Sequence, residues 1–196
     1  MEIYRSVEAI HFKDAAEWRL WLSQNSAKKT GVWLIIYRKN GDIPSVQYDE
    51  ALLQALCFGW IDSKINKRDS QSHYQYFSPR NPKSNWSKVN KLKVAQLLKE
   101  NQMTDLGIQM VNLAKENGTW DALNDVEDLI PHPDMQTLLQ ENPTAANNWE
   151  AFPRSVRRGI LEWIFNAKKP ATRAQRIKET VEKAAQNVRA NQYQKD

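Results

Sequence analysis

The chain has 196 residues, a hydrophobic fraction of 41% and a formal net charge of +5. This length fits one domain or two tightly joined subdomains, and the hydrophobic fraction is enough for a sizeable core. The mean hydropathy of -0.72 and the absence of an apolar run near the roughly 18–20 residues of a membrane helix exclude a membrane-spanning protein.

The N-terminal residues show no basic segment followed by an apolar one, so we expect no signal peptide. Cys57 is the only cysteine, which excludes an internal disulfide and favours a reducing, cytoplasmic location. Because no cation-rich turn precedes Cys57, we expect a buried apolar residue rather than a nucleophile.

The predicted elements alternate between strand and helix up to residue 58. Residues 8–13 alternate weakly and predict a short strand. Asp14 is a good N-cap for a helix over residues 15–25, since its carboxylate can accept from free N–H groups of the first turn. Residues 31–39 are rich in β-branched and aromatic side chains and predict a central strand. Residues 48–58 predict a second helix.

A β-hairpin is predicted next. Gly59 can take a positive φ at the end of the preceding helix. Residues 60–68 and 72–78 both alternate between apolar and polar side chains and are separated by a short polar turn. Pro79 and Pro82 have no N–H to donate, so we expect strand pairing to stop there and a loop to follow.

From Ser87 onward the chain is predicted to be helical. The predicted helices cover residues 88–101, 105–117, 133–141, 143–151, 153–167 and 170–189. The buried stripe expected on the second of them consists of Leu106, Met110, Leu113 and Ala114. Residues 119–133 show little periodicity and are interpreted as a linker. The predicted fold class is α+β, with a small mixed β-sheet and helices in residues 1–86 and a helical part in residues 87–196.

The charge is unevenly distributed along the chain. Residues 61–99 carry nine Lys and Arg against two Asp and Glu, residues 100–153 carry one against ten, and residues 154–196 carry eleven against four. A basic block can mark a nucleic-acid-binding face. Neighbouring blocks can also pack side by side and compensate each other, which we favour because the acidic block would oppose phosphate binding.

The densest cluster of polar side chains that can face a ligand lies in residues 57–90. Its loop brings cations next to a helix N-terminus, where free N–H groups can hold a phosphate or carboxylate. The alternative is that Ser84 and Ser87 cap the helix and the lysines are solvated. The glycine-rich form of a nucleotide P-loop is absent. The candidate ligand-binding residues are Trp60, Asp62, Arg80, Lys83, Ser84, Trp86, Ser87 and Asn90.

Two of these residues have competing interpretations. Asp62 can be a general base, which with Arg80 and Ser84 or Ser87 would make an enzyme for a phosphorylated or carboxylated substrate. It can also form an ion pair with Arg80 across the hairpin, which we favour. Trp86 can stack a nucleic-acid base, but a packing anchor at a helix start is the interpretation we prefer. No catalytic residue is assigned.

We expect neither a metal nor a cofactor, because the three histidines lie in different predicted elements and no metal-ligand spacing occurs. Arg173 and Arg176 lie near the start of the last predicted helix, where cations face an unfavourable helix dipole. We therefore hypothesise that they pair with the acidic residues 100–153 or bind an external anion.

Four stretches, ALCFGWIDSK, YFSPRNPKSNWSKVN, AKENGTW and AKKPATRAQRI, resemble in this order the bacteriocin-protection, YdeI or OmpD-associated family of bacterial proteins. The resemblance covers about residues 10–190, and the helical part over about residues 130–190 resembles the module that names the family. It implies a link to tolerance of antimicrobial peptides and envelope stress, without an established enzyme activity or cofactor. The residues that match its motifs, without assigned roles, are Gly59, Trp60, Ile61, Asp62, Ser78, Pro79, Arg80, Ser84, Trp86, Ser87 and Asn90.

The leading functional hypothesis is a non-catalytic binding protein in peptide or stress tolerance. Its anion site would lie between the hairpin and the SPRNPKSNW loop, and it would take a small anionic ligand or contact a protein partner. An enzyme and a nucleic-acid-binding protein are the alternatives. Direct capture of a cationic peptide is disfavoured, because the two basic blocks would repel it.

Overall fold

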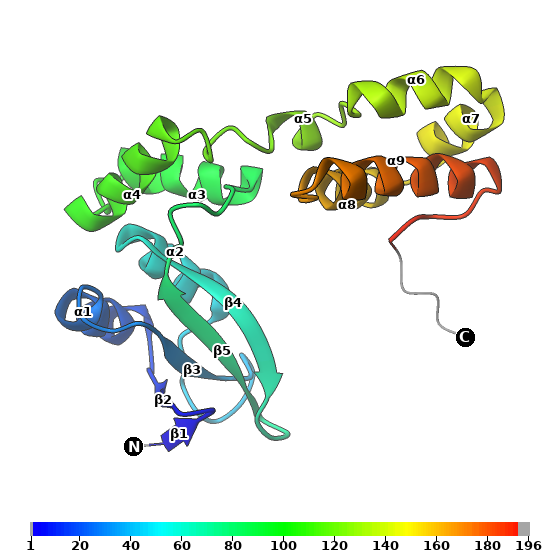
Figure 1. Ribbon diagram of the computed structural model, residues 1–196. Coiled ribbons are helices and arrows are strands. Elements are labelled where there is room, and N and C mark those ends of the chain that lie inside the picture. The colour runs from blue at the N-terminus through cyan, green and yellow to red at the C-terminus, as the bar shows by residue number, and fades with distance from the viewer. Residues whose placement is uncertain (1, 192–196) are drawn as a thin grey trace. The chain divides into compact units, whose positions relative to one another are not determined.

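The computed structural model describes residues 2–191 and divides the chain into two compact units. The first unit extends to Asp121 and contains the β-sheet, whereas the second unit begins at Ala122 and is helical (Figure 1). The fold class is therefore α+β, as predicted. In the part of the chain that the structure describes, no helix is both long and apolar enough to cross a membrane.

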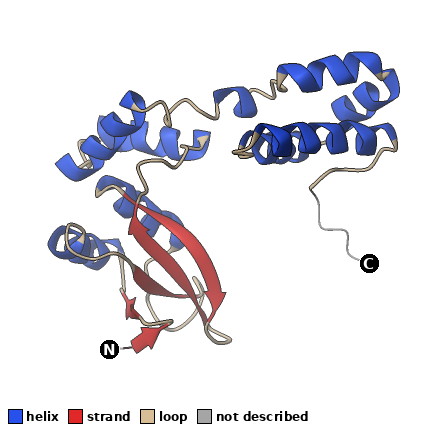
Figure 2. Ribbon diagram, viewed as in Figure 1, coloured by secondary structure: helices blue, strands red, loops and turns tan. Residues whose placement is uncertain are grey.

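The first unit is built on a five-stranded sheet with the order β1-β2-β3-β5-β4 (Figure 2). The strands are β1 (Glu2–Tyr4), β2 (Val7–His11), β3 (Val32–Tyr37), β4 (Trp60–Lys67) and β5 (Ser72–Pro79). Strands β2 and β3 run parallel, and the other neighbouring pairs run antiparallel. The predicted hairpin is confirmed, and so is the central place of the strand predicted over residues 31–39.

Strand β3 is buried on both faces. Val32, Leu34 and Ile36 belong to the core that the helices share, whereas Trp33 and Ile35 belong to a smaller cluster on the opposite face. This follows from the period of two along a strand, which sends successive side chains to opposite faces. A strand buried on both faces has no polar positions, which explains the continuous apolar run in its sequence.

Four helices complete the first unit: α1 (Ala15–Asn25), α2 (Tyr48–Cys57), α3 (Lys88–Lys99) and α4 (Asp105–Glu116). Helices α1, α3 and α4 begin directly after Asp14, Ser87 and Thr104, whose side chains accept hydrogen bonds from backbone N–H groups of the first turn. Such caps satisfy donors that have no partner inside the helix. The predicted starts of these three helices are confirmed.

Helices α3 and α4 are part of the core of the first unit. The residues that they contribute to it are Val94, Leu97, Val111 and Ala114. The predicted division between residues 86 and 87 therefore falls inside this unit, which continues to Asp121 because both helices bury their apolar faces against the sheet-bearing part of the chain.

The buried face of α4 differs from the predicted stripe. Leu106 and Leu113 are 42% and 39% exposed, whereas Ala114 is buried as predicted and Met110 is partly buried against the core. The other buried residues of α4 are Gly107 and Val111. A Cβ atom at position 107 would lie 2.3 Å from the carbonyl oxygen of Cys57. The missing side chain thus allows the backbone of α4 to lie against the end of α2, and this contact decides which face of α4 points inward.

The second unit consists of five helices in the described part of the chain: α5 (Asn124–Glu127), α6 (Pro133–Glu141), α7 (Pro143–Ala151), α8 (Arg154–Phe165) and α9 (Pro170–Ala185). Its core includes Met135, Trp149, Ile160 and Ile177. Part of the predicted linker, residues 119–133, belongs to this unit, because it forms α5 and buries Leu123 and Val126 in the same core.

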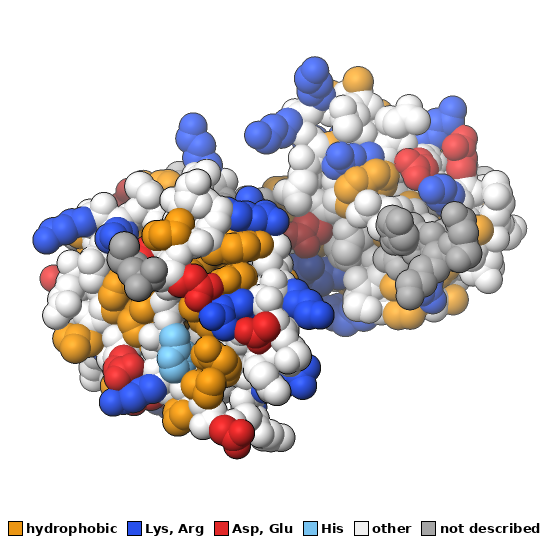
Figure 3. Space-filling model, turned by 90° about the horizontal axis from the view of Figure 1, so that it is seen from below, with side chains coloured by type: hydrophobic (Ala, Val, Ile, Leu, Met, Phe, Trp, Pro, Cys, Tyr) orange, Lys and Arg blue, Asp and Glu red, His pale blue; other side chains and the backbone are white. Residues whose placement is uncertain are grey.

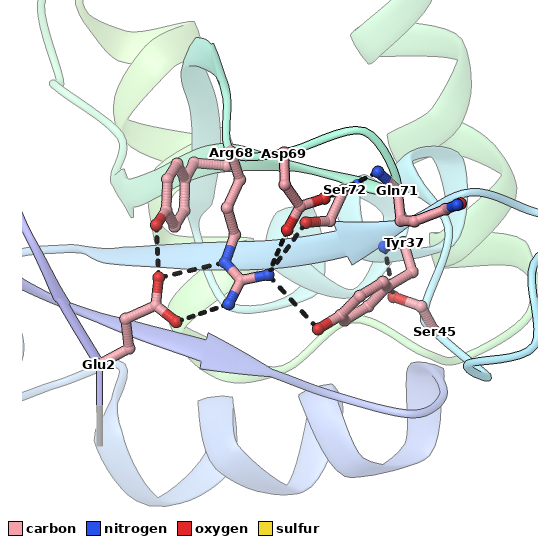
Figure 4. A network of polar contacts seen from close by, with 8 residues as sticks. Glu2, Tyr37, Ser45, Arg68, Asp69, Gln71 and Ser72 are labelled. Carbon is pink, nitrogen blue, oxygen red and sulfur yellow. Dashed lines mark hydrogen bonds and ion pairs between the residues drawn. The ribbon is translucent and has the colours of Figure 1, made fainter.

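A polar network on the first unit joins β1 to the turn between β4 and β5 (Figure 4). Arg68 donates two hydrogen bonds to the Glu2 carboxylate, at 3.1 and 2.9 Å, and pairs with Asp69 at 2.7 Å. The hydroxyl of Tyr74 also donates to Glu2. These bonds, from Arg68 first and Tyr74 second, hold the pKa of Glu2 below its ordinary value of 4.5.

Two helical glycines test the close contact of α4 with α2. We expect Gly107→Ala to lower the free energy of unfolding by about 1–3 kcal/mol, the usual cost of overpacking. At Gly159, inside α8, no neighbouring atom would lie within 4 Å of an added Cβ atom. Gly159→Ala should therefore raise the free energy of unfolding by about 0.5–1 kcal/mol through helix propensity alone. Equilibrium denaturation in urea measures both, and an equal effect of the two changes would contradict the contact.

Acid should weaken the network around Arg68. A carboxylate whose pKa is lower in the folded state contributes stability above its unfolded pKa and loses it as the pH falls through the folded value. We therefore expect the wild type to lose stability between about pH 5 and pH 3 more steeply than the Glu2→Gln variant, which has no titrating group at position 2. Denaturation curves at several pH values measure this, and parallel pH profiles would argue against the network.

Candidate functional site

The loop after β5 is held by hydrogen bonds at both ends. The backbone N–H of Arg80 donates to the Gly59 carbonyl at 2.9 Å, and that of Trp86 donates to the Thr119 carbonyl at 3.1 Å. Between these points, the side chain of Asn117 donates to the Pro82 carbonyl at 2.9 Å. The loop is therefore fastened to the start of β4 and to the segment that follows α4.

Arg80 lies beneath this loop and is only 5% exposed. Its guanidinium stacks on the ring of Trp86, 3.9 Å from the centroid, and donates to the carbonyl of Asn85. Its Nε atom is buried without an acceptor. Burial lowers the pKa of Arg80 to about 10, against a smaller opposing effect of Asp62, so the side chain is still a cation at neutral pH. Arg80 thus holds the loop against the core through contacts on the buried side of the loop.

Asp62 has other partners than the predicted one. Its carboxylate accepts a hydrogen bond from the hydroxyl of Tyr48 at 3.1 Å and a long one from Gln75 at 3.5 Å. Burial and the charge of Asp62 raise the pKa of Tyr48 to about 12. Asp62 and Arg80 form no ion pair among the described residues, so that prediction is wrong. Asp62 lies opposite Phe77 in the sheet, whereas Arg80 lies beyond the last pair of the hairpin.

The two tryptophans of the candidate set are packing residues. Trp60 is 1% exposed and donates from Nε1 to the Ser26 carbonyl at 3.2 Å. Trp86 is 2% exposed and packs against Trp120, with ring centroids 5.0 Å apart. Base stacking needs an accessible ring face, so these positions favour the packing interpretation of Trp86.

The hydroxyls of the loop bind nearby backbone groups. Ser84 donates to the Asn81 carbonyl at 2.7 Å, and Ser87 accepts from the backbone N–H of Asn90 at 3.3 Å. Neither serine donates to Asp62 in the described chain, so the predicted base and nucleophile do not contact each other there. Lys83 lies in the loop before α3 and is exposed. The anion site at this helix start therefore stays a prediction that rests on exposed cations.

Opposite charges compensate each other within each unit. Lys91 pairs with Asp121 at 3.3 Å, and Arg158 pairs with Glu127 at 2.8 Å. Each pair joins a basic block of the sequence to the acidic block. Figure 3 shows cationic and acidic side chains interspersed on the face that it draws. These pairs support the interpretation of the charge blocks as compensating.

The second unit contains a pocket of about 350 Å³. It is lined mostly by apolar side chains, together with a few polar ones that include one of the arginines singled out in the sequence. The lining residues are Asp125, Val126, Ile130, Pro131, His132, Pro133, Gln136, Leu161, Ile164, Phe165 and Arg173. An apolar pocket with a small number of polar groups is the usual form of a small-molecule site.

Hydrogen bonds and one ion pair hold the wall of this pocket. Arg158 on α8 binds the carboxylate of Glu127 with two N–H groups, at 2.8 and 3.1 Å, and so keeps α5 against α8. The side chain of His132 accepts from the Asp134 N–H at 3.2 Å and caps α6. The segment between α5 and α6 is therefore an ordered wall rather than a loose linker.

The two C-terminal candidates lie differently. Arg173 lines the pocket and donates from Nη2 to the Ala167 carbonyl at 3.3 Å. Arg176 does not line it, and its guanidinium lies over the ring of Trp163 at 4.7 Å and donates to the carbonyl of the same residue. Sequence reasoning found Arg173 by its place near a helix start, but missed the pocket, because its walls come from segments that are distant in sequence.

Two family models match the chain. The first, described as Domain of unknown function (DUF8412), matches residues 10–110, just over half of the chain. The second, described as Bacteriocin-protection, YdeI or OmpD-Associated, matches residues 128–187. A search of curated proteins and a search of solved structures gave no match.

The structural role of Arg80 can be tested by truncation. We expect Arg80→Ala to lower the free energy of unfolding by about 2 kcal/mol or more, because it removes buried packing and the stack on Trp86. Lys83→Ala, an exposed change in the same loop, should stay within about 0.5 kcal/mol of wild type. Urea denaturation measures both. An Arg80→Ala protein as stable as wild type would contradict the role.

Proposed function

Because the chain belongs to the DUF8412 family over residues 10–110 and carries a bacteriocin-protection, YdeI or OmpD-associated domain over residues 128–187, we propose that it is a non-catalytic binding protein that supports tolerance of antimicrobial peptides and envelope stress. Its binding site is the pocket of the second unit. The observation that carries this proposal is the position of the pocket, since all its lining residues except Asp125 and Val126 fall within residues 128–187.

The proposed action is indirect. Antimicrobial peptides are usually cationic, and the chain has a net charge of +5. A long-range field of the same sign slows the approach of such a peptide rather than steering it to the surface. A pocket of about 350 Å³ also lies near the lower end of the size range of small-molecule sites. Both arguments favour a small ligand whose binding changes what the protein does, over capture of the peptide itself.

The positions of the loop residues argue against the two alternative functions. Ser84 and Ser87 bind backbone groups and Asp62 binds Tyr48, so these three residues do not form the base and nucleophile on which the enzyme alternative depended. The burial of Trp86 removes the aromatic platform of the nucleic-acid hypothesis, and the ion pairs between the basic blocks and the acidic block weaken its electrostatic basis. We propose a cytoplasmic location, because a chain with a single cysteine cannot form an internal disulfide.

The mouth of the pocket offers a direct test. Ile130 and Phe165 line it and are 49% and 41% exposed, so changing both to Ser should cost little stability while removing apolar contacts with a ligand. We expect a bacterial strain that lacks its own copy to be protected against an antimicrobial peptide by the wild type but not by the Ile130→Ser/Phe165→Ser variant. Survival at graded peptide concentrations measures this.

The matched control is Leu106→Ser/Leu113→Ser. These α4 residues are similarly exposed, at 42% and 39%, but lie in the first unit. This variant should protect as well as wild type, with both variants present at equal levels in the cell. Full protection by the pocket variant would overturn the proposed function.

A further inference from the structure

Resting on the proposed function, we propose that the pocket binds a free amino acid with an apolar side chain, whose carboxylate is held by Arg173 and whose ammonium group is held by Asp125. The pocket joins three features that such a zwitterion needs: an apolar interior, one cation and one anion.

The interior can bury an apolar side chain. Val126, Leu161 and Ile164 are 4%, 4% and 2% exposed and line the pocket from α5 and α8. Ile130 and Phe165 are much more exposed and line it as well. An aliphatic or aromatic side chain that enters would remove these apolar surfaces from water, which is favourable in proportion to the area buried.

Two of the four polar residues that line the pocket already form hydrogen bonds within its wall. His132 accepts from the Asp134 N–H and caps α6. The side-chain amide of Gln136 donates to the Pro131 carbonyl at 2.9 Å and closes the turn before α6. These two contacts hold the shape of the wall, so the charged pair Arg173 and Asp125 is what can recognise a ligand.

Arg173 has donors to spare. A guanidinium carries five N–H donors in a planar fork that matches a carboxylate. Of these, Nη2 donates to the Ala167 carbonyl at a long 3.3 Å. The remaining edge suits a ligand carboxylate. A carboxylate would also relieve the unfavourable position of this cation near the start of α9, whose first turn contains no acidic residue.

Asp125 supplies the opposite charge. It is exposed, lies on α5 and lines the same pocket. Among the described residues, Asp125 and Arg173 do not pair within 4.0 Å, although salt bridges at shorter distances occur elsewhere in the unit. Two opposite charges that share a pocket without neutralising each other match the two ends of a zwitterion.

The charge pattern distinguishes this ligand from related ones. A fatty acid carries only the carboxylate and would bring a second negative charge near Asp125. An apolar amine carries only the ammonium group and would bring a second positive charge near Arg173. The interior of a peptide chain has neither charge. Like charges placed together oppose binding, so the pair selects a molecule with both charges.

The test uses the purified full chain and four probes: L-phenylalanine, N-acetyl-L-phenylalanine, L-phenylalaninamide and octanoate. Amide NMR titration gives the affinity and shows whether residues 125–136 respond. We expect L-phenylalanine to bind, and the three probes that lack one charge to bind at least about tenfold more weakly, the factor that 1.4 kcal/mol produces. Arg173→Gln and Asp125→Asn should each lower the affinity for L-phenylalanine by a similar factor.

Matched controls separate recognition from a general charge effect. Arg176→Gln removes the same charge from α9 outside the pocket, and Asp128→Asn removes an acid just after α5 that does not line it. Both should bind L-phenylalanine as wild type does. The proposed zwitterionic ligand would be overturned if octanoate or L-phenylalaninamide bound as tightly as L-phenylalanine. It would also be overturned if Asp125→Asn or Arg173→Gln bound L-phenylalanine as tightly as the wild type does.

Failure here and failure of the proposed function give different results. If no probe binds but the Ile130→Ser/Phe165→Ser variant still loses protection in cells, the amino-acid ligand is overturned and the function stands. If L-phenylalanine binds as expected but that variant protects fully, the ligand stands and the tolerance function is overturned.

Discussion

Two segments of the first unit, the start of α4 and the loop after β5, are bound to the backbone at the end of α2. The carbonyl of Cys57 accepts both from the N–H of Thr104, at 3.1 Å, and from its hydroxyl, at 2.6 Å, and so fixes the start of α4. The Gly59 carbonyl accepts from Arg80 and fixes the loop after β5. Gly59 itself has a φ of 71°, and a Cβ there would lie 3.2 Å from the Leu106 carbonyl oxygen. Since buried carbonyls need donors, the end of α2 positions two segments, the start of α4 and the loop after β5.

Local chemistry was predictable from the sequence. Asp14 and Ser87 were identified as possible caps, and helices were predicted to begin at Pro133 and Pro143, and the structure confirms all four. A cap satisfies N–H groups within the next three residues, and proline is harmless where a helix has no use for its N–H. Both signals act over a few residues, so the sequence contains everything that they depend on.

Contacts across elements were not predictable in the same way. The periodicity of α4 permitted an apolar stripe one position away from the buried one, and only the approach of α2 to Gly107 decides between them. The pairing of Asp62 with Arg80 failed because the sheet register leaves Arg80 outside the hairpin. The anion site in residues 57–90 stays a prediction, and part of the polar density there has a structural explanation, because an irregular loop closed over a core needs polar groups to satisfy its own backbone.

The second unit shows the opposite relation between sequence and site. Its pocket has no motif, because its lining comes from four helices and one connecting segment and consists mostly of residues that any core could contain. The one local signal is an unfavourable charge. Arg173 is a cation near the start of α9, whose first turn contains no acidic residue. Such a placement costs about 0.3–1 kcal/mol at an exposed site. A residue that opposes its own helix dipole, beside an apolar cavity, is better placed to gain from an incoming carboxylate than one already neutralised by the fold.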